Sequence, residues 1–453
     1  MSPARKPLRS VLIANRGEIA LRILRACREL GLQAVAAYSE ADEDSLPVRL
    51  ADRAVCIGRA PSSQSYLNID ALVGAAVAYG ADAIHPGYGF LAEKPAFAER
   101  CVREGVVFVG PTAEMIRLMG DKIEAKRAAR AAGVPTTPGS EGAVGDPREA
   151  MRIAREIGFP VLLKASAGGG GRGMRIVRRA EELEGMLTEA MAEAEAAFGD
   201  PSMYIERYLE DVRHVEVQVL GDGTDVIHLG ERDCSTQRRN QKLVEEAPSP
   251  AIDAALRARL CEAAVALCRR IGYASAGTVE FILDRASGEF YFMEMNTRIQ
   301  VEHPVTEMVT GVDLVKEQLR IAAGGRLAIR QEDVRLTGHA IECRINAEDA
   351  ERGFAPCPGR VARYLAPGGP GVRVDSHLES GYVVPPYYDS LLAKVICWGA
   401  DRGEALARMR RALAELQVEG VKTTAPFHAS LLEHERFALG DVNTRFIHDV
   451  LGL

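Results

Sequence analysis

The chain has 453 residues, which is too many for one hydrophobic core and predicts about two to four domains of ~100–200 residues each. Its composition, 47% hydrophobic and 26% charged, is that of a soluble globular protein, and the net charge of -7 argues against nucleic acid or an anionic membrane as a partner. The nine cysteines include no C-x-x-C pair, which indicates reduced thiols in a cytoplasmic protein and not a disulfide framework or a zinc site. The apolar run near the basic N-terminus is short, so we expect neither a secretory signal nor a membrane span.

Residues 9–110 alternate short apolar runs with segments of helical periodicity, and glycine or proline ends nearly every segment. Strands are expected at 10–15, 32–39, 54–58, 81–87 and 106–111, and helices at 17–31, 69–80 and 95–105. Strands that alternate with helices of this length are typical of βαβ units around a parallel sheet. The first part of the chain is therefore predicted to be a doubly wound α/β domain.

The middle of the chain predicts a small α+β unit and then a region rich in strands. The first group of expected elements comprises helices at 113–120 and 121–134, a turn-rich linker at 135–147, a helix at 149–158, strands at 160–166 and 173–178, a helix at 180–198 and a strand at 203–209. The second group comprises strands at 214–223 and 225–235, a hairpin over 278–296 and a helix at 312–323. A mixed segment from 338 onward finishes in a helix at 403–417 and a short tail.

The glycine run KASAGGGGRGM, residues 164–174, suggests a nucleotide loop. It fits G-x-G-x-x-G, but a strand and not a helix follows, which argues against a Rossmann dinucleotide site. No G-K-[ST] occurs, so a Walker loop is also excluded. What remains is a glycine loop between two strands, flanked by Lys164 and Arg172, whose backbone N–H groups can wrap a phosphate and which can move. The alternative is a flexible surface hairpin.

Acidic residues occupy two strands that the sequence predicts to be paired. Glu280 lies in GTVEFIL, and Glu294 and Asn296 lie in FYFMEMN, the other arm of the hairpin. Two carboxylates and an amide make an oxygen-rich site of the kind that binds Mg²⁺ or Mn²⁺ beside phosphates. The alternative is a solvated strand face with surface ion pairs. The neighbouring aromatic residues 290–292 indicate that the hairpin is buried, which favours the metal site over this alternative.

Polar side chains continue at every second position after Asn296. In an extended chain Arg298, Gln300 and Glu302 lie on the same face as the metal ligands. An arginine next to a metal site favours a small anion as its partner over an ordinary ion pair. Lys242, in the basic run QRRNQKLVEE, could reach the same place, although that run alone is typical of a solvated loop.

The order of these motifs resembles that of the biotin carboxylases, a family of ATP-grasp enzymes. The matching pieces span nearly the whole chain and are IANRGEIALRI, HPGYGFLAE, RLMGDK, KASAGGGGRGM, RHVEVQV, ERDCSTQRRNQK, EMNTRIQVEHPVTE, ECRINAE and PPYYDSLLAK. Two positions depart from the family pattern. Ala167 stands where a further glycine is common, and Asn240 stands where the family usually has histidine, which puts a contact of Asn240 with nucleotide in doubt.

The resemblance implies a multidomain fold of α/β and α+β units. Its three domains are a doubly wound, Rossmann-like N-terminal domain at 1–117, an ATP-grasp domain at 118–332 with a mobile lid subdomain at about 136–208, and a mixed α/β C-terminal domain at 333–453.

The resemblance also implies roles for individual residues. The ATP-binding residues would be Lys122, Lys164, Gly170, Gly171, Glu206, Arg207, Tyr208, Leu209, His214, Glu280 and Glu294. Two Mg²⁺ or Mn²⁺ ions would be bound by Glu280, Glu294 and Asn296, and bicarbonate by Lys242, Arg298, Gln300 and Val301. The catalytic residues would be Glu302 as general base, Arg298, Lys242 and Arg344, with Arg344 and Tyr88 on the biotin side.

The implied activity is carboxylation of biotin on a biotin carboxyl carrier protein with ATP and bicarbonate, through carboxyphosphate. The A-M-K-M biotin acceptor motif is absent, so the carrier and the carboxyltransferase are expected to be separate chains. The family's stand-alone form is usually a homodimeric component of acetyl-CoA carboxylase, which makes malonyl-CoA for fatty-acid synthesis. A component of a two-subunit pyruvate or propionyl-CoA carboxylase would look much the same.

Two further alternatives remain. Another ATP-grasp ligase, such as a carbamoyl-phosphate synthase half or a purine-pathway carboxylase, would share the nucleotide and metal residues but not the biotin-side motifs. A nucleotide-binding regulatory module would bind ATP without bicarbonate-dependent turnover.

Overall fold

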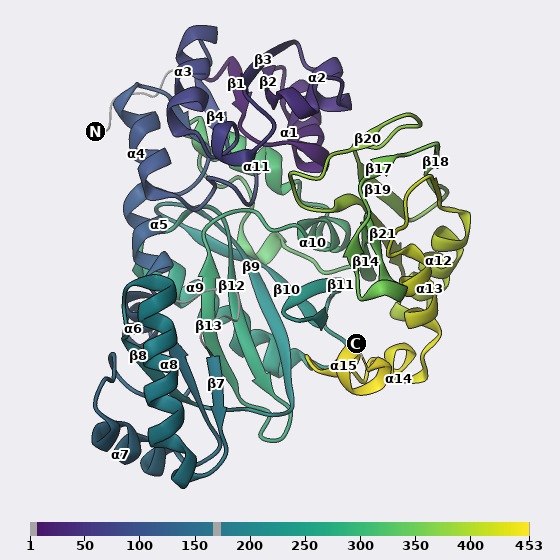
Figure 1. Ribbon diagram of the computed structural model, residues 1–453. Helices are drawn as coiled ribbons and strands as arrows, with labels where there is room; N and C mark the ends of the chain where they lie inside the picture. Colours follow the sequence, from purple (N-terminus) through teal and green to yellow (C-terminus); the bar gives the residue numbers. More distant parts are fainter. Residues whose placement is uncertain (1–6, 166–173, 453) are drawn as a thin grey trace.

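The computed structural model describes residues 7–165 and 174–452. Figure 1 shows the N-terminal elements in purple at the top, the small α+β unit at the lower left and the C-terminal elements in green to yellow at the right. In the described ranges, none of the helices has the length and apolar character that a membrane crossing needs. All nine cysteines are free thiols, as the sequence predicts.

The N-terminal domain contains a five-stranded sheet whose neighbouring strands are all parallel, as predicted. Its elements are β1 (Ser10–Ile13), α1 (Gly17–Glu29), β2 (Gln33–Ser39), α2 (Leu46–Leu50), β3 (Arg53–Gly58), α3 (Ile69–Tyr79), β4 (Ala83–His85), α4 (Pro95–Arg103) and β5 (Val107–Phe108). The strand order β3-β2-β1-β4-β5 reverses direction between β1 and β4. Ligands of such sheets bind outside the carboxyl ends of the strands at this switch point. The turns after β1 and β4 are therefore expected to line a site.

The small α+β unit folds as the sequence predicts, with a three-stranded antiparallel sheet covered by two helices. It comprises α7 (Pro147–Ile157), β6 (Val161–Ala165), β7 (Met174–Val177), α8 (Leu183–Phe198) and β8 (Met203–Arg207). The preceding segment is more than a linker, because Gly139 and Val144 form bridges to β8 and Thr136 forms one to the strand that contains Phe292. These bridges tie the unit to the rest of the protein.

The centre of the molecule is an eight-stranded antiparallel sheet with the order β13-β12-β9-β10-β11-β14-β21-β19. Its strands are β9 (Val212–Asp222), β10 (Val226–Arg238), β11 (Gln241–Ala247), β12 (Ala274–Asp284), β13 (Phe290–Asn296), β14 (His339–Asn346), β19 (Val372–Ser376) and β21 (Leu391–Gly399). The sheet is continuous through the β11–β14 pairing, so it joins strands of the middle and C-terminal parts of the chain. The basic run at 237–246 belongs to the β10–β11 hairpin and not to the solvated loop that such a run alone is typical of.

The remaining helices surround this sheet. They are α5 (Ala113–Gly120), α6 (Lys122–Ala131), α9 (Ala254–Arg270), α10 (His303–Thr310), α11 (Leu314–Ala322), α12 (Arg402–Glu415), α13 (Ala425–Glu433), α14 (Glu435–Ala438) and α15 (Phe446–Leu451). The short strands are β15 (Glu348–Asp349), β16 (Ala355–Pro356), β17 (Gly359–Arg360), β18 (Arg363–Leu365), β20 (Val383–Val384) and β22 (Gln417–Glu419). The sequence-based assignment did not include α9 or α10.

Candidate active site

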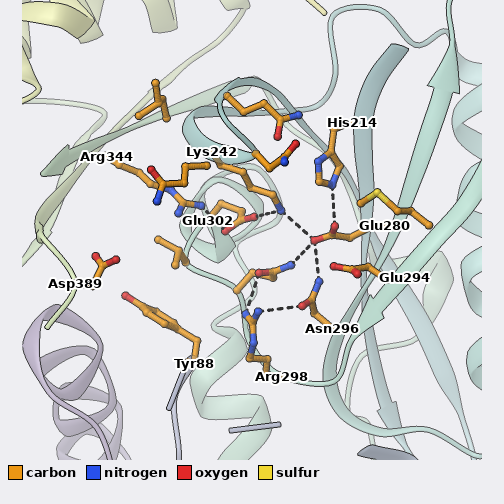
Figure 2. A pocket seen from close by; sticks show the side chains of 18 of the residues that line it. Tyr88, His214, Lys242, Glu280, Glu294, Asn296, Arg298, Glu302, Arg344 and Asp389 are labelled. Atoms are coloured by element: carbon orange, nitrogen blue, oxygen red, sulfur yellow. Dashed lines mark hydrogen bonds and ion pairs between the residues drawn. The ribbon is translucent and has the colours of Figure 1, made fainter. Parts of the chain in front are cut away.

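A cavity of about 830 Å³ lies where the N-terminal domain, the α+β unit and the central sheet meet. Residues after β1 and β4 line it, as the switch-point argument predicts, together with residues of α6, β6, β9, β11, β12, β13 and β14. Figure 2 shows His214, Glu280 and Glu294 on one side of this pocket and Tyr88, Asp389 and Arg344 on the other, with Lys242 and Glu302 between them.

The predicted β12–β13 hairpin places two carboxylates face to face, because Glu280 and Glu294 are direct partners in its register. The Glu280 carboxylate is surrounded by donors: Asn296 Nδ2 and Gln300 Nε2 each donate at 2.8 Å, and His214 Nε2 lies at 2.9 Å. Burial favours the protonated acid, but the charges of Lys242 and His214 outweigh it and hold the pKa of Glu280 below its usual range. Glu280 is therefore an ionised oxygen donor.

Glu294 lacks comparable partners, and no hydrogen bond from the described residues reaches its carboxylate. Burial and the neighbouring Glu280 charge raise the pKa of Glu294. Two carboxylates and the Asn296 amide oxygen, set opposite each other at one end of a hairpin, are the donor set that a hard divalent cation takes. The residues present thus fit the predicted Mg²⁺ or Mn²⁺ site.

Lys242 lies inside a ring of carboxylates. Its Nζ is 2.6 Å from Glu216 Oε2, 3.0 Å from Glu280 Oε1 and 2.6 Å from Glu302 Oε1. Burial alone lowers the pKa of a lysine, but the surrounding anionic groups raise the pKa of Lys242 well above its usual value. The hairpin turn that delivers it has Arg239 and Asn240 at φ +48° and +64°, a left-handed turn in which asparagine is favoured. Asn240 also lines the pocket.

Glu302 is fully buried and accepts from two cations. Lys242 reaches one carboxylate oxygen, and Arg344 Nη2 donates to the other at 2.9 Å. These charges overcome burial and hold the pKa of Glu302 well below its usual range. Arg344 also donates from Nε to Glu245 Oε1 at 2.6 Å. The site therefore holds an ionised carboxylate, a possible base, between two side chains that can bind an anion.

The segment after Asn296 is not an extension of the strand. β13 ends at Asn296, and residues 297–302 bend into α10, with Glu302 immediately before the helix. Arg298 nevertheless lines the pocket, and its Nη1 donates to Gln300 Oε1 at 2.9 Å. Its Nε pairs with Glu93 at 2.8 Å, so the guanidinium has a carboxylate partner from the N-terminal domain in addition to the pocket. The polar side chains converge through this bend, and the prediction of one extended face was wrong.

A cluster of lysines lies at the other end of the pocket. Lys122 and Lys126, four residues apart on one face of α6, and Lys164 of β6 line the cavity. The Glu206 carboxylate binds Lys164 Nζ at 2.7 Å on one oxygen and Lys126 on the other. Burial and neighbouring cations lower the pKa of Lys126 to about 7 and that of Lys164 to about 8. Such a cluster suits a polyphosphate.

Of the other predicted site residues, some line the pocket, some do not, and some lie outside the described residues. Tyr88 and Val301 line the pocket, and the Tyr88 hydroxyl donates to Glu18. Arg207, at the end of β8, and Tyr208 and Leu209, which follow it, are not among the described residues that line the cavity. Ala167, Gly170 and Gly171 lie outside the described residues.

Comparison with known families identifies the chain. Family models match three consecutive stretches: biotin carboxylase, N-terminal domain, over 7–116; carbamoyl-phosphate synthase L chain, ATP binding domain, over 121–330; and biotin carboxylase C-terminal domain over 342–449. The biotin carboxylase of Pseudomonas aeruginosa is 59% identical over 448 residues, which cover 98% of this chain and 99% of that relative. The chain belongs to the biotin carboxylase family. It is an ATP-dependent ligase of that family, which confirms the predicted resemblance and the fold class.

Two further similarities bear on its context. A pyruvate carboxylase subunit of Methanothermobacter thermautotrophicus is 54% identical over 440 residues, covering 97% of this chain and 89% of that relative. The biotin carboxylase domain dimer of the Hydrogenobacter thermophilus 2-oxoglutarate carboxylase, solved with MgADP, ADP and bicarbonate, matches with a TM-score of 0.92 and 52% identity over 98% of each chain.

Several residues of this biotin carboxylase site were missed from the sequence. Glu216 follows His214 by two positions on β9, so the alternation used for β13 could have found it. Glu245 lies on β11 three positions after Lys242, so alternation from Lys242 does not point to it. Lys126 follows Lys122 by four positions on α6, so helical spacing could have found it. Glu93 carries no local signal, because only the packing of distant elements brings it to Arg298.

Proposed function

We propose that this chain carboxylates biotin on a biotin carboxyl carrier protein, consuming ATP and bicarbonate and releasing ADP and phosphate. The observation that carries the proposal is the ionised Glu302 carboxylate, held by Lys242 and Arg344 in the same cavity as the lysine cluster and the Glu280–Glu294 pair. A base, an anion site and a polyphosphate site in one pocket are what the coupling of bicarbonate to ATP requires.

In the first half-reaction, Lys242 and Arg298, assisted by Gln300 and Val301, hold bicarbonate while Glu302 accepts its proton. The bicarbonate oxygen then attacks the γ-phosphorus of ATP, ADP leaves, and carboxyphosphate forms. Lys122 and Lys164, which line the cavity, would hold the phosphates together with the family's glycine loop, to which Gly170 and Gly171 belong. Glu206 and His214 line the cavity and would lie near the adenine and ribose, and the family resemblance adds Arg207, Tyr208 and Leu209. Glu280, Glu294 and Asn296 would hold divalent ions, which neutralise charge on the phosphates when bound.

In the second half-reaction, carboxyphosphate breaks down to CO₂ and phosphate. The phosphate takes the ureido proton of biotin, the ureido nitrogen forms its bond to CO₂, and Arg344 stabilises the negative charge on the ureido oxygen. Tyr88 forms a wall of the biotin side. The division at 1–117, 118–332 with a lid at about 136–208, and 333–453 is part of the same proposal, and the three matched ranges support it.

The cellular role that we propose is the first half-reaction of acetyl-CoA carboxylase in the cytoplasm, leading to malonyl-CoA and fatty-acid synthesis. The name and near-complete coverage of the Pseudomonas relative support it. The biotin carboxylase component of a pyruvate carboxylase is the second candidate, which the Methanothermobacter relative favours. Carboxyltransferase subunits would be the further partners, and the neighbour solved as a dimer supports a homodimer.

The test is ADP formation by the purified chain with ATP, Mg²⁺ and bicarbonate, with and without free biotin. We expect ADP release that depends on bicarbonate and rises with biotin, together with carboxybiotin. An ADP formation rate that does not change when biotin is added would point to another ATP-grasp ligase. Nucleotide binding without turnover would point to a regulatory module. Addition of a biotinylated carrier with transferases specific for acetyl-CoA or pyruvate then separates the two cellular roles.

A further inference from the structure

A buried ion pair lies directly behind the biotin side of the pocket. Lys394 of β21 has a side chain with 0% exposure, and its Nζ is 3.0 Å from Glu18 Oε1 of α1, whose side chain is 2% exposed. Both residues belong to motifs that the family resemblance singled out, IANRGEIALRI and PPYYDSLLAK, but the proposed mechanism uses neither.

The pair contacts two residues of the pocket. Lys394 Nζ donates to the Val301 carbonyl at 2.8 Å and lies 5.9 Å from the centre of the Tyr88 ring. The Tyr88 hydroxyl donates to Glu18 Oε1, the same oxygen that faces Lys394. Lys394 is also the cross-strand partner of Arg344 in the β14–β21 register. The Lys394 ammonium therefore joins the N-terminal domain to the bend before Glu302, and its strand is paired with the strand that carries Arg344.

Such a pair is expensive for the fold, because two charges must leave water. Burial lowers the pKa of a lysine, but Glu18, Glu342 and Asp375 together raise the pKa of Lys394, so the ammonium persists. Well-packed apolar residues of similar volume would often stabilise a protein as well or better. A purely structural role thus accounts poorly for the charges, whereas a charged donor and a charged acceptor hold a peptide carbonyl and a phenol more strongly than neutral groups do.

We propose that Lys394 and Glu18 are positioning residues that fix the Tyr88 ring and the Val301–Glu302 peptide for carboxyl transfer to biotin. The proposal rests on the proposed function. Lys394 holds the peptide through Val301, and Glu18 holds the ring through its hydroxyl. The Glu302 carboxylate itself is held separately by Lys242 and Arg344, and the pair reaches the bicarbonate side only through the Val301 carbonyl, so ATP cleavage depends on the pair less than carboxyl transfer does. Losing the pair should therefore harm the second half-reaction more than the first.

The test is the double variant Glu18→Gln/Lys394→Met, which removes both charges of the pair at nearly constant volume. Asp375, which also faces Lys394, keeps its own partner Arg373. Glu419→Gln/Arg363→Met, an exposed pair between β18 and β22, is the matched control. Three quantities are measured: the melting temperature, bicarbonate-dependent ADP formation without biotin, and carboxybiotin formed per ADP with the KM for free biotin. We expect ADP formation to stay within about threefold of the wild type while carboxybiotin formation falls ~10- to 100-fold and the KM for biotin rises.

Tyr88→Phe is the second variant and covers the case in which the double variant does not fold. It removes the hydroxyl that donates to Glu18 but keeps the ring, and we expect the KM for biotin to rise by a larger factor than bicarbonate-dependent ADP formation without biotin falls. An unchanged KM and unchanged coupling in the folded variants would overturn the inference, as would an equal fall of both half-reactions. Absence of biotin-dependent turnover in the wild type would instead contradict the proposed function itself.

Discussion

Replacing Arg344 by serine should uncouple ATP cleavage from carboxyl transfer. Arg344 holds Glu302 and Glu245 in the present structure and lines the cavity, where the proposed mechanism uses it to stabilise the ureido oxygen. A donor aimed at a developing oxyanion is typically worth ~10²–10³-fold in rate, or about 2.7–4 kcal/mol. We expect carboxybiotin formation to fall by that factor.

ATP cleavage should survive better, for two reasons visible in the site. Glu302 keeps Lys242 at 2.6 Å, which maintains its ionised form without Arg344. Burial already raises the pKa of Glu245 to about 7 although Arg344 opposes the shift, so removing Arg344 raises that pKa further. Glu245 then takes up a proton at neutral pH, and the variant does not carry an isolated buried charge there. Bicarbonate-dependent ADP formation is therefore expected within ~10-fold of the wild type, less than the loss expected for a missing oxyanion donor.

The assay compares ADP and carboxybiotin at saturating bicarbonate for the wild type, Arg344→Ser and Glu302→Gln. Arg363→Ser, on an exposed β18 position, controls for nonspecific effects of losing an arginine. Glu302→Gln should abolish both products because the base is lost before ATP is cleaved. If Arg344→Ser lowers ADP and carboxybiotin in the same proportion with unchanged coupling, the assignment of Arg344 to the second half-reaction is refuted.

Two further predictions concern the metal and the phosphates. Glu294→Gln should raise the Mg²⁺ concentration needed for half-maximal ATP cleavage at least ~10-fold, because losing even a residue that only supports a metal ligand typically costs that much. Glu289→Gln is the control: this exposed carboxylate lies at the turn before β13, and its loss should leave the Mg²⁺ requirement unchanged. An unchanged Mg²⁺ requirement in Glu294→Gln would remove Glu294 from the metal site. The pKa values of Lys126 and Lys164 are lowered to about 7 and 8, so part of these side chains is neutral near pH 8. Phosphate binding favours their charged ammonium forms, and ATP binding should therefore take up protons. ATP affinity should weaken as the pH rises from about 7 to 9. Calorimetric titrations in buffers of different ionisation enthalpy measure this uptake, and no uptake or a net release would contradict it.

The sequence predicted those parts of the site that one local pattern contains. Alternation along β12 and β13 predicted that Glu280, Glu294 and Asn296 would lie together, and the paired strands bring them together. Their role as metal ligands stays a prediction. The same rule failed after Asn296, where the chain bends and the polar side chains converge from a turn. Helix α9 was missed although Asp253 caps it, with its side chain accepting from Leu256 N at 2.8 Å.

Contacts between distant segments were beyond any local pattern. Glu93 meets Arg298 across 205 positions, and Lys394 meets the Val301 carbonyl across 93. Such contacts depend on how the N-terminal sheet and the C-terminal strands assemble on the central sheet. The sequence could name the residues through family resemblance, but only the assembled structure shows which of them touch.

Lys242 ties the two halves of the site together electrostatically. Its ammonium is within 3.0 Å of both Glu280, on the metal side, and Glu302, the proposed base. If Glu280 holds a divalent ion as proposed, its carboxylate would have less negative charge to share with Lys242. Lys242 is then balanced mainly by Glu216 and Glu302, and it can accept an additional anion more readily than before. Binding of nucleotide and metal would in this way prepare the bicarbonate site through the charge of one side chain.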